Sequence, residues 1–186
     1  MRGPKGELDL DDLTDAELIG RAPKDHAAFE ALMRRHGPRV SALARSMVGD
    51  SNAEDVLQEV FISVYKSLSS FRGDSEFSTW LHRIALNTCY AKLKKTPLDS
   101  LEHLDLPSSQ NVHKNAERAQ VRQLIEQGLR TLPLEQREAF ALREFSGLEY
   151  DAIAELLRCQ LGTVKSRISR ARNSLREYLS ARGISP

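Results

Sequence analysis

Residues 163–179 read TVKSRISRARNSLREYL, and this stretch decides the fold of the C-terminal half. Its apolar side chains recur at the three- to four-residue spacing of one helical stripe: Val164, Ile168, Ala171, Leu175 and Leu179. Its basic side chains lie off this stripe: Lys165, Arg167, Arg170, Arg172 and Arg176. The pattern predicts an amphipathic helix with a basic outer face, for which Thr163 can serve as N-cap.

The residues just before this helix complete a supersecondary pattern. Residues 150–157 have the composition of a short apolar helix, and residues 158–162 form a tight connection. A short helix, a brief turn and a basic second helix are typical of a helix-turn-helix, whose second helix enters the major groove. The basic residues begin in the first helical turn, where cations oppose the helix dipole and add little stability. DNA binding is therefore favoured over the alternative, a solvated basic face on an ordinary bundle.

Length and composition are those of an ordinary globular protein, with 186 residues of which 40% are hydrophobic and 28% charged. The formal net charge is only +1, so nucleic-acid binding must come from local patches. Cys89 and Cys159 are far apart and lie within apolar patterns, which indicates reduced thiols in a reducing compartment. No apolar run approaches the length of a membrane span, and the N-terminus lacks the core of a signal peptide. We therefore expect a cytoplasmic protein with no membrane span of its own.

The N-terminal half has the periodicity of several helices. Residues 14–17 form a capping-box pattern for a short helix, and Gly37-Pro38 should kink or break the longer helix that follows. Residues 51–54 form a second capping-box pattern. The helix predicted after it has the most regular apolar stripe of the chain: Ala53, Val56, Leu57, Val60, Phe61, Val64 and Leu68.

The opposite face of that helix begins with polar residues, namely Glu54, Asp55, Gln58 and Glu59. Acids in the first turns complement the helix dipole, so stabilisation and solubility explain them. A docking patch for a partner protein explains them equally well. The residues alone leave both interpretations open.

Residues 77–95 predict a further helix, in which Trp80 lies among apolar side chains. Its polar and basic members are Arg83, Asn87, Lys92, Lys94 and Lys95. Aromatic rings beside cations can stack on unpaired bases while the cations hold phosphates. A single tryptophan at helical spacing is more often a core residue, and lysines at a helix C-terminus also suit the dipole.

A change of composition separates the two halves. Residues 96–114 contain two prolines, paired serines and few clustered apolar residues, which predicts a flexible, acidic linker. Helical patterns resume after it, with Pro133 at the start of one helix, and no strand signal appears. The sequence predicts an all-α protein of two small helical domains, 12–95 and 115–182, the second a helix-turn-helix.

No catalytic or metal-binding pattern emerges. The five histidines lie in different segments without ligand spacing, no glycine loop for phosphate is present, and no serine has the context of a nucleophile. We therefore expect a protein that is not an enzyme and that holds no cofactor or metal.

Three stretches together resemble the extracytoplasmic-function (ECF) group of bacterial RNA polymerase sigma factors: AEDVLQEVF at 53–61, FRGDSEFSTWLHRIALN at 71–87 and GTVKSRISRAR at 162–172. The resemblance covers almost the whole chain, and the order and spacing of the stretches make it specific. It implies a protein that binds core RNA polymerase and promoter DNA and directs transcription initiation. It also implies an anti-sigma factor as partner.

The resemblance assigns roles to individual residues. Those that would dock on the coiled coil of the largest polymerase subunit are Asp55, Gln58, Glu59 and Phe61. Those that would read the −10 promoter element as a single strand are Trp80, Arg83, Asn87, Lys92, Lys94 and Lys95, with Asn87 at the pocket for a flipped-out base. Those that would read the −35 element as a duplex are Arg143, Thr163, Lys165, Ser166, Arg167, Ser169, Arg170 and Arg172.

Some positions depart from the commonest family pattern. Arg158 stands where many helix-turn-helix motifs place glycine, Gln160 replaces a frequent proline, and Ser169 is small where some members carry a bulky side chain. The main rival interpretation is a stand-alone helix-turn-helix regulator, which would bind a palindromic duplex without polymerase. A small helical nucleic-acid-processing enzyme is a second rival, against which the missing metal ligands argue.

Overall fold

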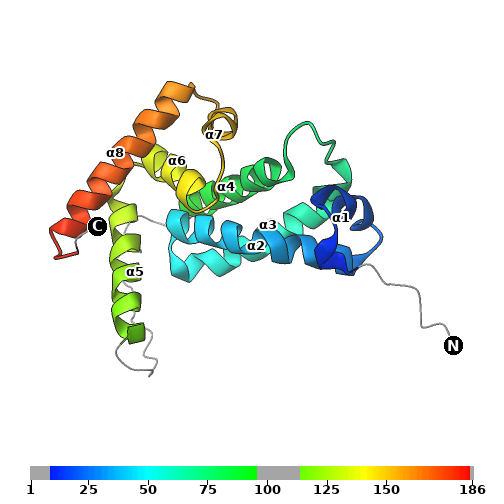
Figure 1. Ribbon diagram of the computed structural model, residues 1–186, viewed down its shortest axis with the longest axis horizontal. Coiled ribbons are helices and arrows are strands. Elements are labelled where there is room, and N and C mark those ends of the chain that lie inside the picture. The colour runs from blue at the N-terminus through cyan, green and yellow to red at the C-terminus, as the bar shows by residue number, and fades with distance from the viewer. Residues whose placement is uncertain (1–8, 96–113, 185–186) are drawn as a thin grey trace.

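The computed structural model describes residues 9–95 and 114–184, and every regular element in these ranges is helical (Figure 1). The N-terminal half contains η1 (Leu10–Asp12), α1 (Asp15–Arg21), α2 (His26–Val48), α3 (Asp50–Ser67), η2 (Leu68–Ser70) and α4 (Phe77–Lys95). The C-terminal half contains α5 (Lys114–Thr131), α6 (Leu134–Glu144), α7 (Tyr150–Leu157) and α8 (Leu161–Ser180). The predicted all-α fold is confirmed. The predicted linker lies outside the described residues except for Lys114, where α5 begins.

The N-terminal domain is built around α2, which packs on α3 and α4 and is joined to α3 by a sharp reversal. The apolar stripe of α3 faces inward, and Val56, Val60 and Val64 are fully buried. Gly49 makes the reversal possible because its φ of 82° lies in the left-handed region that favours glycine. Arg130 of α5 lies directly over this turn, where a Cβ on Gly49 would meet its guanidinium.

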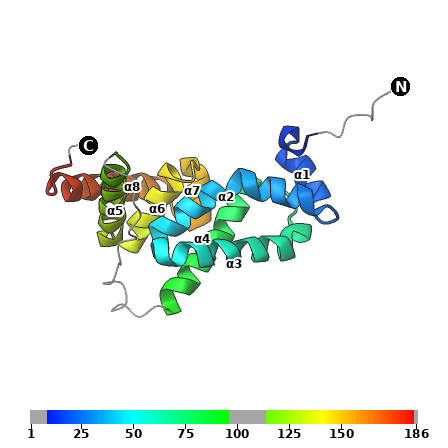
Figure 2. The ribbon, with the colours of Figure 1, turned by 90° about the horizontal axis from the view of Figure 1, so that it is seen from below.

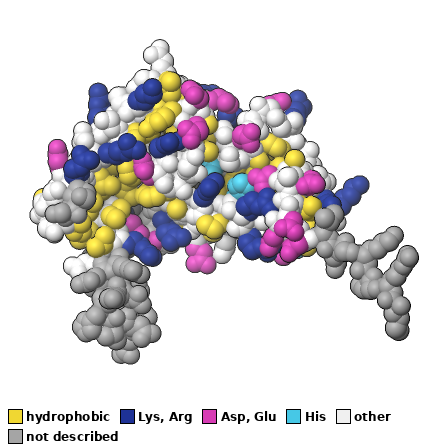
Figure 3. Space-filling model, viewed as in Figure 1, with side chains coloured by type: hydrophobic (Ala, Val, Ile, Leu, Met, Phe, Trp, Pro, Cys, Tyr) yellow, Lys and Arg dark blue, Asp and Glu magenta, His cyan; other side chains and the backbone are white. Residues whose placement is uncertain are grey.

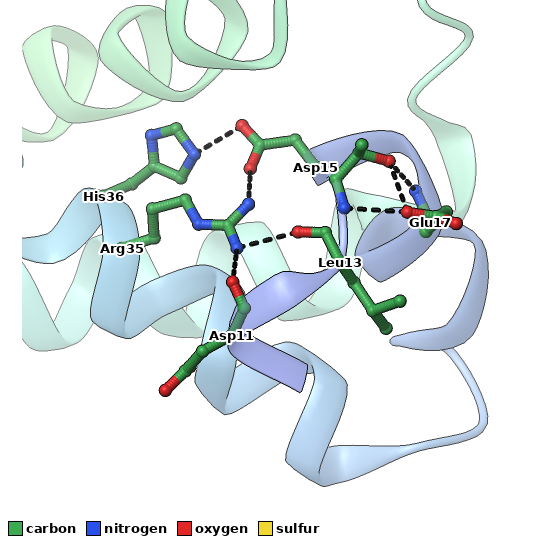
Figure 4. Close-up of polar contacts among 7 residues, drawn as sticks. Asp11, Leu13, Asp15, Glu17, Arg35 and His36 are labelled. Atoms are coloured by element: carbon green, nitrogen blue, oxygen red, sulfur yellow. Dashed lines mark hydrogen bonds and ion pairs between the residues drawn. The ribbon is translucent and has the colours of Figure 1, made fainter. Parts of the chain in front are cut away.

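The short helix α1 is held against α2 by a polar cluster, shown in Figure 4. The carboxylate of Asp15 accepts a hydrogen bond from Arg35 at 2.6 Å and lies 2.7 Å from Nε2 of His36. The same Arg35 guanidinium donates to the backbone oxygen of Leu13 at 2.8 Å. Burial alone would raise the pKa of Asp15, but the hydrogen bonds and charges of Arg35 and His36 lower it below its ordinary value.

We expect Asp15→Asn to lower the free energy of unfolding at neutral pH by about 1–3 kcal/mol, because the replaced carboxylate makes charge-assisted hydrogen bonds. A lowered pKa stabilises the fold above the unfolded-state value of 3.8, and this stabilisation is lost as the pH falls through the folded-state value. Urea titrations between pH 3 and pH 7 should therefore show a weaker acid dependence for the variant. The exposed Asp74→Asn serves as control, and equal pH profiles for both variants would contradict the role of Asp15.

Two local expectations for the N-terminal half, a break in α2 and a cap at residues 51–54, are wrong. Helix α2 runs unbroken through Gly37 and Pro38, so a break at this point is wrong, whereas a kink there stays a prediction. Gly37 is buried, and a Cβ at this position would meet the ring of Phe61 at 3.2 Å. Helix α3 begins at Asp50, directly after the Gly49 turn, so the predicted cap at residues 51–54 already lies inside the helix. The capping box of α1 is confirmed, since Thr14 and Glu17 exchange hydrogen bonds.

The C-terminal domain contains the predicted helix-turn-helix, formed by α7 and α8. Ile153 of α7 packs in one core with Val164 and Ile168 of α8. Helix α8 begins at Leu161 with Gln160 at its N-cap position, so the predicted N-cap role of Thr163 is wrong. The backbone carbonyl of Gln160 accepts the hydrogen bond of the Thr163 amide at 2.9 Å instead.

The turn of this motif depends on a left-handed residue. Arg158 has φ 51° and ψ 47°, a conformation in which a Cβ is crowded, and it ends α7. We expect Arg158→Gly to raise the free energy of unfolding by about 0.5–1 kcal/mol, after allowing for the greater freedom of glycine in the unfolded chain. Thermal unfolding with Arg158→Ala as control should separate the effects, because alanine keeps the Cβ. Equal shifts for the two variants would contradict this explanation.

The two domains pack against each other. Helix α2 contacts α5 and α6, and α4 contacts α7, as Figures 1 and 2 show from two directions. One cluster of buried apolar residues runs from the N-terminal domain into α6, α7 and the first half of α8. A smaller cluster joins α5 to the second half of α8. Within the described residues, no helix is long and apolar enough to cross a membrane.

Candidate protein and nucleic-acid interfaces

The first candidate surface lies on α3. Gln58 and Glu59 are exposed, and Asp55 is exposed but paired with Lys92 of α4, whose Nζ lies 2.9 Å from its carboxylate. Phe61 is half-buried against α2. The structure therefore brings the four sequence-predicted docking residues to one helix, with one of them engaged by a neighbouring helix.

Two apolar residues on the same helix extend this surface. Ile62 and Tyr65 are 54% and 56% exposed, although both are large hydrophobic side chains. The ring of Tyr65 packs edge-on against Phe29 with 5.1 Å between centroids, which fixes its orientation. Beside them a groove of about 410 Å³ is lined by Phe29, Met33 and Phe61. We call Gln58, Glu59, Phe61, Ile62 and Tyr65 the α3 surface. An apolar patch rimmed by polar groups is typical of a protein interface.

The sequence interpretation missed Ile62 and Tyr65. A signal was available, because both lie off the apolar stripe of α3, on the face that carries Gln58 and Glu59. Large apolar residues on the polar face of an amphipathic helix need an explanation other than the core.

The second candidate surface lies on α4. Arg83 and Asn87 are both exposed, one helical turn apart, and so share a face. The guanidinium of Arg83 lies 3.3 Å from the carboxylate of Glu155 on α7. Trp80 is half-buried and packs with the ring of Phe71 at 5.2 Å, so its indole is partly a core element. Lys94 and Lys95 are exposed at the C-terminal end of the helix.

The third candidate surface lies on α8, over which Lys and Arg side chains gather (Figure 3). Lys165, Ser169 and Arg170 are exposed on this helix, and we call these three the α8 face. Arg172 is also exposed, but its guanidinium is hydrogen-bonded to Glu144 of α6. These positions leave a basic, accessible stripe on α8.

Other members of the predicted −35 set are engaged within the protein. Ser166 donates its hydroxyl hydrogen bond to the backbone oxygen of Thr163 at 2.9 Å, and both side chains are half-buried. Arg167 lies against Glu138 of α6 at 3.6 Å. Arg143 donates to the backbone oxygen of Leu148 at 2.9 Å, and so braces the turn between α6 and α7.

Metal binding has no evident centre in the part of the chain that the structure describes. No group of three or more His, Cys, Asp or Glu side chains there is arranged to hold a metal ion. Cys89 is buried and Cys159 is half-buried, both as free thiols. Burial raises the pKa of the Cys89 thiol to about 12, so this thiol is not a reactive nucleophile.

Each half of the chain matches the model of a known protein family. The family model for sigma-70 region 2 matches residues 32–96, and the model for sigma-70 region 4 matches residues 122–175. The chain is 37% identical over 177 residues to the ECF RNA polymerase sigma-E factor of Escherichia coli strain K12, covering 88% of this chain and 93% of that protein. It is 38% identical over 180 residues to the RNA polymerase sigma-H factor of Pseudomonas aeruginosa, covering 89% and 93%.

Solved structures give the same relationship. The structure of CnrH in complex with the cytosolic domain of CnrY matches with a TM-score of 0.67 and 26% identity, over 93% of this chain and 99% of that one. The sigma factor RpoE of Bartonella quintana, in complex with the anti-sigma factor NepR, matches with a TM-score of 0.66 and 28% identity, over 82% and 96%. Helical domains of both region types, in this order and with relatives along nearly the whole chain, settle the family. The chain belongs to the ECF group of RNA polymerase sigma factors, and it directs transcription initiation.

Proposed function

We propose that this sigma factor acts through three surfaces, one for polymerase and two for promoter DNA. The α3 surface binds core RNA polymerase, the exposed face of α4 reads the −10 element, and the α8 face reads the −35 element. The observation that carries the proposal is that exposed residues of the matching types lie on three different helices. The corresponding domains are residues 12–95 and 115–182, joined by residues 96–114.

Docking to polymerase combines apolar and polar contacts. Ile62 and Tyr65 are apolar anchors whose exposed surface becomes buried when polymerase binds. Gln58 and Glu59 make polar contacts with a basic surface of the partner. Asp55 belongs to the same docking set. It contributes to polymerase binding in one of two ways: directly, after its ion pair with Lys92 rearranges, or indirectly, because that ion pair holds α3 against α4. Phe61 lines the adjoining groove.

Recognition of the −10 element uses an opened strand. Asn87 presents an amide at the exposed face of α4, and an amide can pair with the Watson–Crick edge of a base that has left the stack. Arg83, Lys94 and Lys95 offer cations for the strand's phosphates, with Lys92 beside them. Trp80 supports this face from beneath, through its packing on Phe71.

Recognition of the −35 element uses the major groove of a duplex. Arg170 and Ser169 contact base edges, and Lys165 and Arg172 contact phosphates. Thr163, Ser166 and Arg143 shape this surface through their internal hydrogen bonds. Arg167 joins it when its contact with Glu138 opens. Each reader alone is small, so binding both elements through one polymerase multiplies their affinities by effective concentration.

A partner that silences the chain is part of this proposal. One structural neighbour is a sigma factor in complex with an anti-sigma factor, and another is in complex with a cytosolic domain. We propose that an anti-sigma factor likewise binds this chain, and that the chain works in the cytoplasm with polymerase. Its role is regulatory and requires no catalytic residue of its own.

An electrophoretic mobility shift with and without core RNA polymerase tests this function. We expect the chain alone to bind promoter DNA weakly, since its net charge is +1 and its basic patches are small. Core polymerase and the chain together should form a promoter complex that neither forms alone. Tight binding of the chain alone to a palindromic duplex would instead favour a stand-alone regulator.

A further inference from the structure

A large apolar side chain lies at the start of the helix that carries the α8 face. Leu161 is the first residue of α8, directly after Gln160 at the N-cap position, and it is 36% exposed. It belongs to neither buried apolar cluster of the described residues. Within residues 150–180, which form the helix-turn-helix, no other large hydrophobic side chain is exposed. A single exposed leucine needs no explanation by itself, so its surroundings must decide its role.

The surroundings of Leu161 on α8 are open and polar. Lys165 and Ser169 follow it at steps of four residues, so the three side chains form one row along the helix. Gly162 is exposed as well, and a Cβ at this position would meet nothing within 4 Å, so the helix is uncovered at this point. The N-terminal end of α8, drawn in orange, stands at the edge of the molecule (Figure 1). The α8 face therefore continues to an accessible apolar position at the start of the helix.

The start of α8 is anchored without Leu161. A hydrophobic residue just before the N-cap often packs against the fourth residue of a helix and fixes the direction in which the chain enters it. Cys159 and Val164 occupy these two positions. Val164 is fully buried, and Cys159 packs against the buried cluster to which Val164 belongs. A structural role at the helix start is thus already filled by other residues.

The chemistry of the major groove indicates what Leu161 can contact. The bases present hydrogen-bond donors and acceptors there, and thymine adds the C5 methyl group, which is apolar. The side chain of Leu161 has no donor or acceptor, so it cannot read the polar groups of a base. A recognition helix contacts base edges with the residues near its N-terminus, which is where Leu161 lies.

We propose that Leu161 is a specificity-determining residue of the −35 reader, and that it contacts the C5 methyl group of a thymine. Because thymine pairs with adenine, this contact selects an A·T pair at one position of the −35 element. It adds an apolar contact to a face that otherwise offers cations and a hydroxyl. The inference rests on the proposed function, since it requires α8 to lie in the major groove.

Replacing thymine by deoxyuridine tests this contact, because the two bases pair identically and differ only in the C5 methyl group. Holoenzyme is reconstituted from core RNA polymerase and the full-length chain, and it is titrated onto a labelled promoter found by mapping the start sites that the chain activates. Each thymine of the −35 element, on either strand, is replaced in turn. Replacement of the contacted thymine should weaken binding by wild-type holoenzyme about fourfold, the change that corresponds to one buried methyl group.

Variants of Leu161 connect the methyl group to this residue. Leu161→Ala should bind the thymine promoter about fourfold more weakly than the wild-type chain, and deoxyuridine should then weaken binding no further. Such non-additivity is the signature of a direct contact. Leu161→Met keeps an apolar side chain of similar volume and should keep the sensitivity to deoxyuridine. Val121→Ala is the matched control, because Val121 is also large, apolar and 38% exposed but lies on α5, and it should respond to deoxyuridine as the wild-type chain does.

The outcomes separate this contact from the function on which it rests. If no deoxyuridine replacement weakens wild-type binding, or if the −35 element contains no thymine on either strand, the contact is overturned and the sigma function stands. If Leu161→Ala keeps the full sensitivity to deoxyuridine, another residue contacts the methyl group, and the inference fails even where the variant binds more weakly. Failure of wild-type holoenzyme to bind the promoter would overturn the proposed function itself.

Discussion

Replacing Ile62 and Tyr65 together by alanine should weaken binding to core RNA polymerase by about 30-fold or more, which corresponds to about 2 kcal/mol. Aromatic and apolar anchors at the centre of an interface carry most of its binding energy, and these two are the large exposed apolar residues of α3. The free energy of unfolding should change by less than about 1 kcal/mol, because each side chain is more than half exposed in the folded protein. Anisotropy titration with core polymerase measures the first quantity and urea unfolding the second.

Val121→Ala with Leu161→Ala is the matched control for this variant. These residues are 38% and 36% exposed, are also large and apolar, and lie on α5 and at the start of α8. Their replacement removes exposed apolar area away from the α3 surface, although less of it, and should leave polymerase affinity unchanged. Wild-type affinity in the α3 variant would contradict the placement of the docking surface. An equal loss in the control would mean that exposed apolar area in general, and not this helix, binds polymerase.

Replacing Arg170 by alanine should cost about 1–3 kcal/mol in recognition of the −35 element, if its guanidinium contacts a base edge. Arg170 is exposed on α8, and its guanidinium forms no hydrogen bond or ion pair with another described residue. The loss should be confined to promoters that carry the preferred base at the contacted position. Transcription by the reconstituted holoenzyme on promoters with single −35 substitutions would show this dependence.

Arg176→Ala is the control for Arg170. Arg176 is exposed on the same helix but lies more than one turn further from its start, and its guanidinium contacts Asn173 at 3.4 Å. We expect a smaller loss that is the same on every promoter. A uniform loss for Arg170→Ala would make Arg170 a phosphate contact and would contradict its assignment to base reading.

Hydrophobic periodicity predicted most of the fold because each long helix buries one stripe. Val56, Val60 and Val64 on α3 are fully buried, as the spacing requires, and the range predicted for α4 is the range observed. Local capping patterns predicted the starts of the helices less well. Thr163 and residues 51–54 look like caps, but α8 already begins at Leu161 after Gln160, and α3 already begins at Asp50 after the left-handed Gly49.

The candidate surfaces could be predicted only in part. The sequence predicts that the polar residues of α3 and the basic residues of α8 are exposed, because they lie off the apolar stripe that each helix buries. The sequence does not predict which exposed side chains form ion pairs, because pairs such as Arg83 with Glu155 join residues far apart in the chain. The contact between Tyr90 and Glu138 spans 48 residues and two domains, and no sequence pattern marks either member.

Transcript mapping after overproduction of the chain tests most directly that it directs polymerase to promoters through two separate readers. We expect new start sites that share two sequence motifs at a constant spacing, near positions −10 and −35, and that vanish when Ile62 and Tyr65 are replaced. No new start sites, or new sites that share a single palindromic motif, would contradict it.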